Sequence, residues 1–156
     1  MTVTYVDDVE VLYRAVRANA DEYRLETDGR LRFTANAFKD SLCKPSVDRS
    51  NLRNDPRDTR FSPSDGVTSL ITKDVRAIGT VLVMNPDGRT VKQVYRVDAL
   101  HRPVIKSEAE PRDNPAHCQI ECDPEIRNTH FKKLKEALAL LATQRGWIVE
   151  PEETRS

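Results

Sequence analysis

The amino-acid sequence predicts a single α+β domain: a mostly antiparallel sheet with a β-hairpin, and a C-terminal amphipathic helix packed on it. Three observations support this fold class. Two β-rich runs flank a tight turn within residues 80–97, an apolar stripe of helical spacing lies near the C-terminus, and period-two alternation marks the N-terminus. A length of 156 residues suits one domain. We assign residues 1–150 to it and 151–156 to a frayed tail.

The N-terminal half is expected to alternate short strands with short helices. Its first strand is the clearest, because in VEVLYRAVR the side chains of Val9, Val11, Tyr13 and Ala15 share one face. We expect strands at 9–17, 30–34 and 66–70, a short helix or turn at 35–42, and a short helix at 72–79. Two polar, proline-containing segments, 44–66 and 98–115, show little periodicity and are expected to be long loops, which in compact domains are usually functional or disordered.

The hairpin and the last helix carry the strongest local signals. Asn85-Pro86-Asp87-Gly88 combines a proline that fixes one turn residue with a glycine that supplies positive φ. We expect the helix to begin after Thr129 as N-cap and to end at Gly146, with a short strand at 147–149. Its apolar stripe consists of Phe131, Leu134, Leu138 and Leu141. We expect this stripe to cover the strand at 116–122 and Leu138 to be fully buried.

The segment NPAHCQIEC, residues 114–122, raises the question of a metal site. Cys118, Ile120 and Cys122 alternate with His117 and polar residues, so the pattern is that of a strand. Positions i and i+4 of a strand lie roughly 13 Å apart, too far for two ligands of one zinc at about 2.3 Å. We expect both thiols to be small apolar core groups and no metal to be bound.

Composition excludes several classes of function. Lys plus Arg and Asp plus Glu both number 25, so no net field attracts nucleic acid or an anionic membrane. Five glycines form no phosphate-binding loop, so we expect no cofactor. No apolar run approaches the ~20 residues of a membrane span. Three cysteines without regular spacing and an N-terminus without a secretory signal indicate a cytoplasmic protein.

The polar segment 44–66 holds a series of arginines. They are Arg49, Arg53, Arg57 and Arg60. Nucleic-acid binding is one hypothesis, but from Lys39 to Arg60 six basic residues face four aspartates, and Pro56 interrupts any helix that would align the arginines. Because arginine is enriched at protein interfaces, a protein partner is the favoured explanation.

Several motifs resemble those of a group of short bacterial proteins of unassigned function. They are VLYRAVR, RFTANAFKD, SVDRSNL, GVTSLITKDVR and NPAHCQI, with AFKD, SVD and NPAH the strongest. The chain departs from the usual R-P-S-x-x-A-F form by having Phe33 for proline, and its hairpin at 80–97 is like an insertion. A fainter similarity is to ADP-ribosyltransferase-like domains, in which Arg14 and Thr34 match the arginine and the Ser/Thr of two strands. Glu121 is then the candidate catalytic glutamate.

Three functions remain open from the sequence. The favoured hypothesis is a non-catalytic accessory protein of a bacterial operon that docks a protein partner through its Arg/Asp-rich loop and hairpin. The first alternative is an enzyme acting on a nucleotide or NAD-like substrate, in which Arg14 holds a phosphate, Asp48 orients and His117 acts as base. This alternative requires the three residues to share one pocket. The second alternative is nucleic-acid binding through the four arginines.

Overall fold

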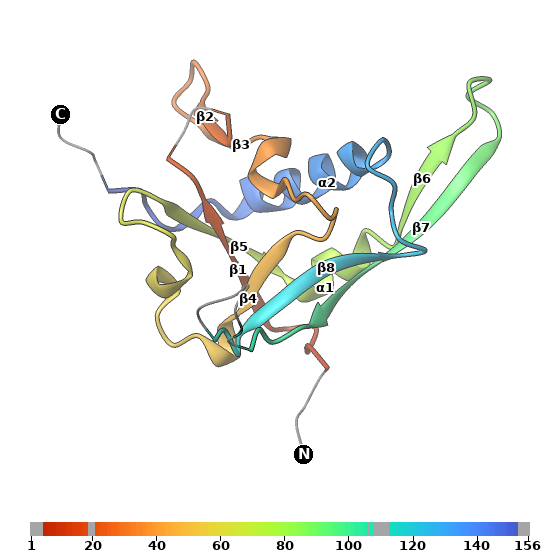
Figure 1. The fold of residues 1–156 in the computed structure, drawn as a ribbon. Coiled ribbons are helices and arrows are strands. Elements are labelled where there is room, and N and C mark those ends of the chain that lie inside the picture. Colours follow the sequence, from red (N-terminus) through yellow and green to blue (C-terminus); the bar gives the residue numbers. More distant parts are fainter. Residues whose placement is uncertain (1–4, 19–20, 106, 108–112, 153–156) are drawn as a thin grey trace.

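The computed structural model describes residues 5–18, 21–105, 107 and 113–152 and shows the expected α+β fold (Figure 1). Within these residues a seven-stranded antiparallel sheet runs in the order β6-β7-β8-β4-β1-β5-β9. Its strands are β1 (Val11–Val16), β4 (Ser46–Arg49), β5 (Gly66–Ile71), β6 (Thr80–Met84), β7 (Val91–His101), β8 (His117–Asp123) and β9 (Trp147–Val149). A second sheet pairs β2 (Tyr23–Leu25) with β3 (Leu31–Phe33).

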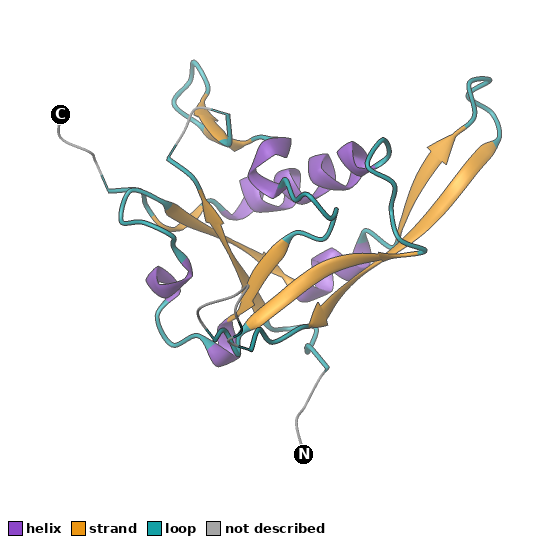
Figure 2. Cartoon of the chain, viewed as in Figure 1, coloured by secondary structure: helices purple, strands orange, loops and turns teal. Residues whose placement is uncertain are grey.

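The helical elements flank the large sheet, and Figure 2 shows the longest of them lying along one side of it. They are α1 (Thr72–Ala77), α2 (Phe131–Arg145) and the 3-10 helices η1 (Ala35–Phe38), η2 (Ser50–Leu52) and η3 (Pro56–Thr59). No helix in the described part of the chain is long and apolar enough to cross a membrane.

Alternate residues of the central strands build the core. Val47 of β4 lies opposite Cys118 of β8, and both belong to one apolar cluster with Leu134 and Leu138 of α2. Leu138 is fully buried, as predicted. The main neighbours of α2 are η1, β3 and β5, so the prediction that the helix chiefly covers β8 is corrected. Of the strands in the large sheet, β5 is the one that α2 contacts most.

The predicted C-terminal end of α2 is confirmed, and its predicted N-terminal cap is wrong. Gly146 ends the helix with φ of 76°, a conformation that glycine adopts without steric cost. The N-terminal cap is not Thr129, because α2 begins at Phe131 and His130 occupies the cap position without a side-chain cap bond. The imidazole Nδ1 of His130 instead lies 2.7 Å from the Tyr95 hydroxyl. This bond joins the start of α2 to β7.

The two segments expected to be long loops contain part of the sheet. Residues 46–49 form β4, which lies between β8 and β1, and β7 extends to His101. Val104 then forms an isolated bridge with Asn114. Sequence reasoning missed β4 because a central strand with polar residues on one face and prolines nearby has a weak apolar pattern. Of the predicted tail, residues 153–156 lie outside the described part of the chain.

The small sheet is anchored to the large one by aromatic rings. Trp147 of β9 makes edge-to-face contacts with Tyr23 and Phe33, with ring centroids 5.1 and 4.8 Å apart. Gly66 makes room for this ring, because a Cβ atom there would lie 2.3 Å from the indole. The described residues on either side of 19–20 therefore belong to one folded unit.

Candidate functional site

A cavity of about 670 Å³ lies on the polar face of the sheet, opposite α2. Strand alternation fixes this face: Val47 and Cys118 point into the core, so their neighbours Ser46, Asp48 and His117 point the other way. The cavity is lined by Tyr13, Arg14, Ala15, Ser46, Val47, Asp48, Arg53, Asp58, Thr59, Arg60, Phe61, Val104, Asp113, Asn114 and His117. Its volume is in the range of small-molecule sites.

The cavity brings together the three residues that the enzyme hypothesis named. Arg14 comes from β1, Asp48 from β4 and His117 from β8, and these strands are neighbours in the sheet. Tyr13 lies opposite Asp48, and Asp48 lies opposite His117. All three residues line the cavity, but their side chains do not all point into it. Arg14 shares the core face of β1 with Leu12 and reaches η1, whereas Asp48 and His117 point to the polar face. The requirement of a shared pocket is therefore met for Asp48 and His117 and not for the Arg14 guanidinium.

Asp48 is the centre of a buried polar network. Its carboxylate accepts hydrogen bonds from the Arg53 guanidinium, the Thr59 hydroxyl and the Asn114 amide, each at 2.9 Å. The same Arg53 nitrogen also donates to the Asn114 side-chain oxygen at 2.9 Å. Asp48 is buried and accepts from three side chains of the cavity lining. Its carboxylate therefore fixes the positions of these side chains in the cavity wall.

His117 has a defined orientation and tautomer. Its Nδ1 lies 2.7 Å from the Arg102 carbonyl oxygen, which can only accept, so Nδ1 carries the hydrogen. Its Nε2 lies 3.0 Å from the Ser46 hydroxyl and therefore accepts from it. Asp48 is not the group that orients this imidazole, since the Arg102 carbonyl fills that place.

Arg14 links the diverging strands beside the cavity. Pairing of β1 with β4 ends at Tyr13–Asp48, and beyond it the Arg14 guanidinium donates to the carbonyls of Ser46, Ala37 and Lys39 at 2.8–3.0 Å. Burial lowers the pKa of this guanidinium. Within the described residues Arg14 makes no salt bridge with a carboxylate, and three of its five N–H groups are used. Because Arg14 shares the core face of β1 with Leu12, its guanidinium ties η1 to β4 and does not face Asp48 and His117.

The four arginines predicted to bind a partner or nucleic acid have different environments. Arg49 is buried in a bidentate ion pair with Glu10 at 2.9–3.0 Å, where Asn51 also donates. Arg53 belongs to the Asp48 network. Arg60 donates to backbone carbonyls and lies 3.4 Å from Glu152. Only the Arg57 guanidinium is largely exposed, at 63%, and it pairs with Asp55. The structure therefore does not place the four side chains on one basic surface.

The other two residues of the ADP-ribosyltransferase-like pattern lie away from the cavity lining. Thr34 donates its hydroxyl to the Asp21 carbonyl. Glu121 of β8 accepts from the Arg102 guanidinium at 2.9 Å. Neither residue belongs to the cavity lining.

Cys118 and Cys122 lie in or against the apolar core, as expected. Cys118 is buried and Cys122 half-buried, and Cys43, for which the sequence made no prediction, is buried as well. Burial raises the pKa of the Cys118 thiol to about 12 and that of Cys122 to about 11. Among the described residues no three His, Cys, Asp or Glu side chains are grouped to hold a metal ion.

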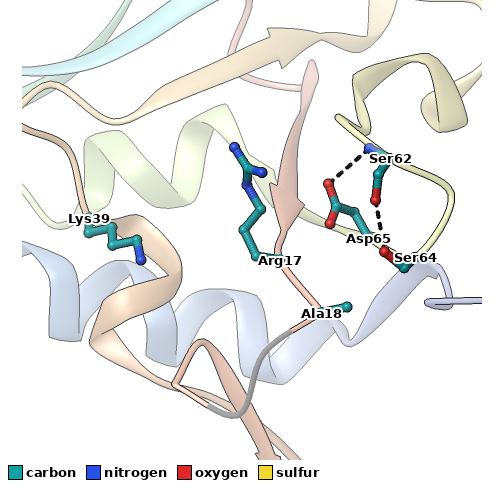
Figure 3. A pocket seen from close by; sticks show the side chains of 6 residues that line it. All are labelled: Arg17, Ala18, Lys39, Ser62, Ser64 and Asp65. Carbon is teal, nitrogen blue, oxygen red and sulfur yellow. Dashed lines mark hydrogen bonds between the residues drawn. The ribbon is translucent and has the colours of Figure 1, made fainter. Parts of the chain in front are cut away.

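A second cavity, of about 470 Å³, lies between the end of β1 and the loop before β5 (Figure 3). Arg17 and Lys39 approach it from one side, and Ser62, Ser64 and Asp65 from the other. The two hydroxyls bond each other at 2.8 Å, and Asp65 accepts the Ser62 N–H at 3.2 Å. These side chains stabilise the loop itself, and the cavity lacks the convergent network of the first.

Sequence reasoning missed several residues of the larger cavity. Ser46, Arg53 as a partner of Asp48, Thr59 and Asn114 all contribute hydrogen bonds there. One signal was available: SVD and NPAH, two of the strongest motif fragments, contain Ser46, Asp48, Asn114 and His117. Their contact depends on β4 pairing with β8, which the sequence did not predict.

Comparison with protein-family models, curated proteins and solved structures found no match to this chain.

Proposed function

We propose that this protein is an enzyme that binds a nucleotide or NAD-like substrate in the cavity on the polar face of its sheet. The observation that carries the proposal is the placement of Asp48 and His117, from neighbouring strands, in one cavity with Arg53. In this function Arg53 contacts a phosphate group and His117 is the general base. Asp48 holds the wall against which the substrate lies.

An unused hydrogen-bond donor supports an anionic substrate. The Nε–H of Arg53, a residue of the cavity lining, is buried with no partner among the described residues. A buried donor without a partner costs roughly 1–3 kcal/mol, a cost that a phosphate oxygen in the cavity would remove. Tyr13 and Phe61 also line the cavity and offer aromatic surfaces to a base.

Titration with AMP, ADP-ribose and NAD⁺ tests the binding step. We expect at least one of them to raise the melting temperature in a concentration-dependent way, because a ligand of the folded state stabilises it. Arg53→Lys keeps the charge but loses the fork geometry, and should weaken binding by about tenfold. Arg57→Lys is the matched control and should leave binding unchanged. No stabilisation by any of the three at about 1 mM would count against the proposal.

The catalytic step is followed by chromatography of the products formed from the ligand that binds. His117→Gln should lower turnover by about 10²-fold or more while changing affinity little. His130→Gln is the matched control, since His130 contacts Tyr95 far along the sheet. Equal turnover in wild type and His117→Gln would remove His117 from the mechanism.

A second candidate function is docking of a protein partner through the hairpin of β6 and β7. Figure 1 shows this hairpin extending beyond the helices and the rest of the sheet. β6 is an edge strand of uncharged sequence, TVLVM, and such an edge can accept a further strand. Exposed apolar side chains accompany it on both strands: Leu82, Met84, Val91 and Val94. The occupant that fits is an extended apolar segment of another protein.

Docking is tested by cross-linking in native cells followed by purification. We expect Leu82→Lys with Val94→Lys to abolish the cross-linked species without altering the melting temperature by more than a few degrees, because both positions are exposed. If the wild-type protein forms no cross-linked species in native cells, this candidate function is weakened. The result is independent of the cavity variants, so the two functions can be judged separately.

A further inference from the structure

We propose that Ser46 is a nucleophile activated by His117, and that the cavity hydrolyses a carboxylic ester of a phosphorylated, nucleotide-like compound. This inference deepens the proposed function and rests on it for the nature of the substrate. It adds a residue that the sequence did not single out. It also specifies which proton His117 removes as general base, namely that of the Ser46 hydroxyl.

The arrangement of three groups carries the inference. The Ser46 hydroxyl lies 3.0 Å from His117 Nε2, and His117 Nδ1 lies 2.7 Å from the Arg102 carbonyl oxygen. Nucleophile, base and an acceptor that orients the base are the minimal set for an activated hydroxyl. Here a backbone carbonyl takes the place that a carboxylate often has.

The base is held firmly. Besides accepting from the imidazole, Arg102 donates its own N–H to the His117 carbonyl at 3.0 Å. The Arg102 side chain is fixed in turn by Glu121, at 2.9 Å. These contacts keep Nε2 directed at Ser46 and leave no freedom for the other tautomer.

Both reacting groups are accessible from the cavity. Ser46 and His117 line it and are half-buried, so a substrate can reach them. The cation of the same cavity wall is Arg53, whose Nε–H is buried without a partner among the described residues.

The reaction proceeds in two balanced halves. Ser46 Oγ attacks the ester carbon while His117 Nε2 takes its proton; the alcohol then leaves with that proton, and the acyl group stays on Ser46. Water next attacks the acyl carbon and gives its proton to Nε2. The bond to Oγ breaks, Ser46 regains the proton, and the free acid departs.

A fluorophosphonate probe tests the nucleophile without a substrate. We expect one equivalent to attach to Ser46, located by peptide mass spectrometry, and Ser46→Ala to abolish it. His117→Gln should slow labelling by about 100-fold or more. Ser50→Ala is the matched control, a half-buried serine of η2. Labelling of another serine, or equal rates with and without His117, would overturn the inference.

A thiol at the same place gives a second measurement. In Ser46→Cys, iodoacetamide should alkylate residue 46 about tenfold or more faster than in Ser46→Cys with His117→Gln at pH 7, because an adjacent imidazole favours the thiolate. The native Cys118 and Cys122 give little background, since their thiols remain protonated. Equal rates in the two variants would contradict activation by His117.

The two proposals fail in different ways. If a nucleotide stabilises the protein but neither probe reacts at residue 46, the binding site stands and the nucleophile is wrong. If Ser46 is labelled and no nucleotide binds, the nucleophile stands and the substrate class is wrong. Hydrolysis of p-nitrophenyl acetate that is lost in Ser46→Ala would support the ester chemistry directly.

Discussion

The two faces of the same strands differ in how they are held together. On the core face, Val47, Cys118 and Ile120 belong to one apolar cluster held together by nonspecific contact. On the polar face, Asp48 and His117 are held by hydrogen bonds of defined direction. A shift of one residue in β4 would exchange the faces. The comparison teaches that one alternating pattern serves stability on one side and leaves the other side available for chemistry.

Arg49 is the exception on the core-facing side and gives the largest expected effect. It lies opposite Leu12, and its side chain is 7% exposed beside a fully buried Glu10. Arg49→Ala leaves that carboxylate buried without its cation, which should cost about 3–5 kcal/mol in urea denaturation. Arg57→Ala, in an exposed and solvent-screened pair, should shift the urea midpoint far less. Similar losses in both variants would show that Arg49 is not structural.

Replacing Leu138 tests how much the apolar contacts of the core contribute to stability. Leu138→Ala should lower the free energy of unfolding by about 2–5 kcal/mol, because its side chain is fully buried among core residues. Leu140→Ala, two positions away and 62% exposed, should change it by no more than about 0.5 kcal/mol. A Leu138→Ala midpoint equal to wild type would mean that α2 is covered by a partner instead.

The two faces also differ in what the sequence could predict. The hairpin turn, the period of α2 and the buried Leu138 depend on local pattern, and the structure confirms them. The strand β4 was missed because alternation between Val47 and its polar neighbours is short. The contacts of Ser46 with His117 and of Asp48 with Asn114 join residues 71 and 66 apart. Such contacts follow from sheet order, which local periodicity does not contain.

Replacing Asp48 tests how much the hydrogen bonds of the polar face contribute to stability. Asp48→Asn retains one acceptor but loses the charge that holds Arg53, so it should cost roughly 1–3 kcal/mol. Asp55→Asn is the control. Asp55 pairs with Arg57 at the surface, where solvent screens the pair, so its replacement should change the stability far less than Asp48→Asn does. An Asp48→Asn protein as stable as wild type would show that the network does not hold the face together.

The smallest expected effect comes from the core thiols at alkaline pH. Burial raises the pKa of Cys118 to about 12, from 9.0 in the unfolded chain, so the folded state holds this proton more tightly. The stabilisation is therefore fully present below about pH 9 and is lost as the pH rises towards 12. Between pH 8 and pH 10 we expect the free energy of unfolding to fall by about 1 kcal/mol from this thiol alone. Cys118→Ala removes the group, so its stability should fall less over the same range when both proteins are unfolded in urea. The polar-face variant Ser46→Ala should keep the wild-type slope, because no thiol is lost. Parallel curves for wild type and Cys118→Ala would show that the core face at β8 admits enough water to solvate a thiolate.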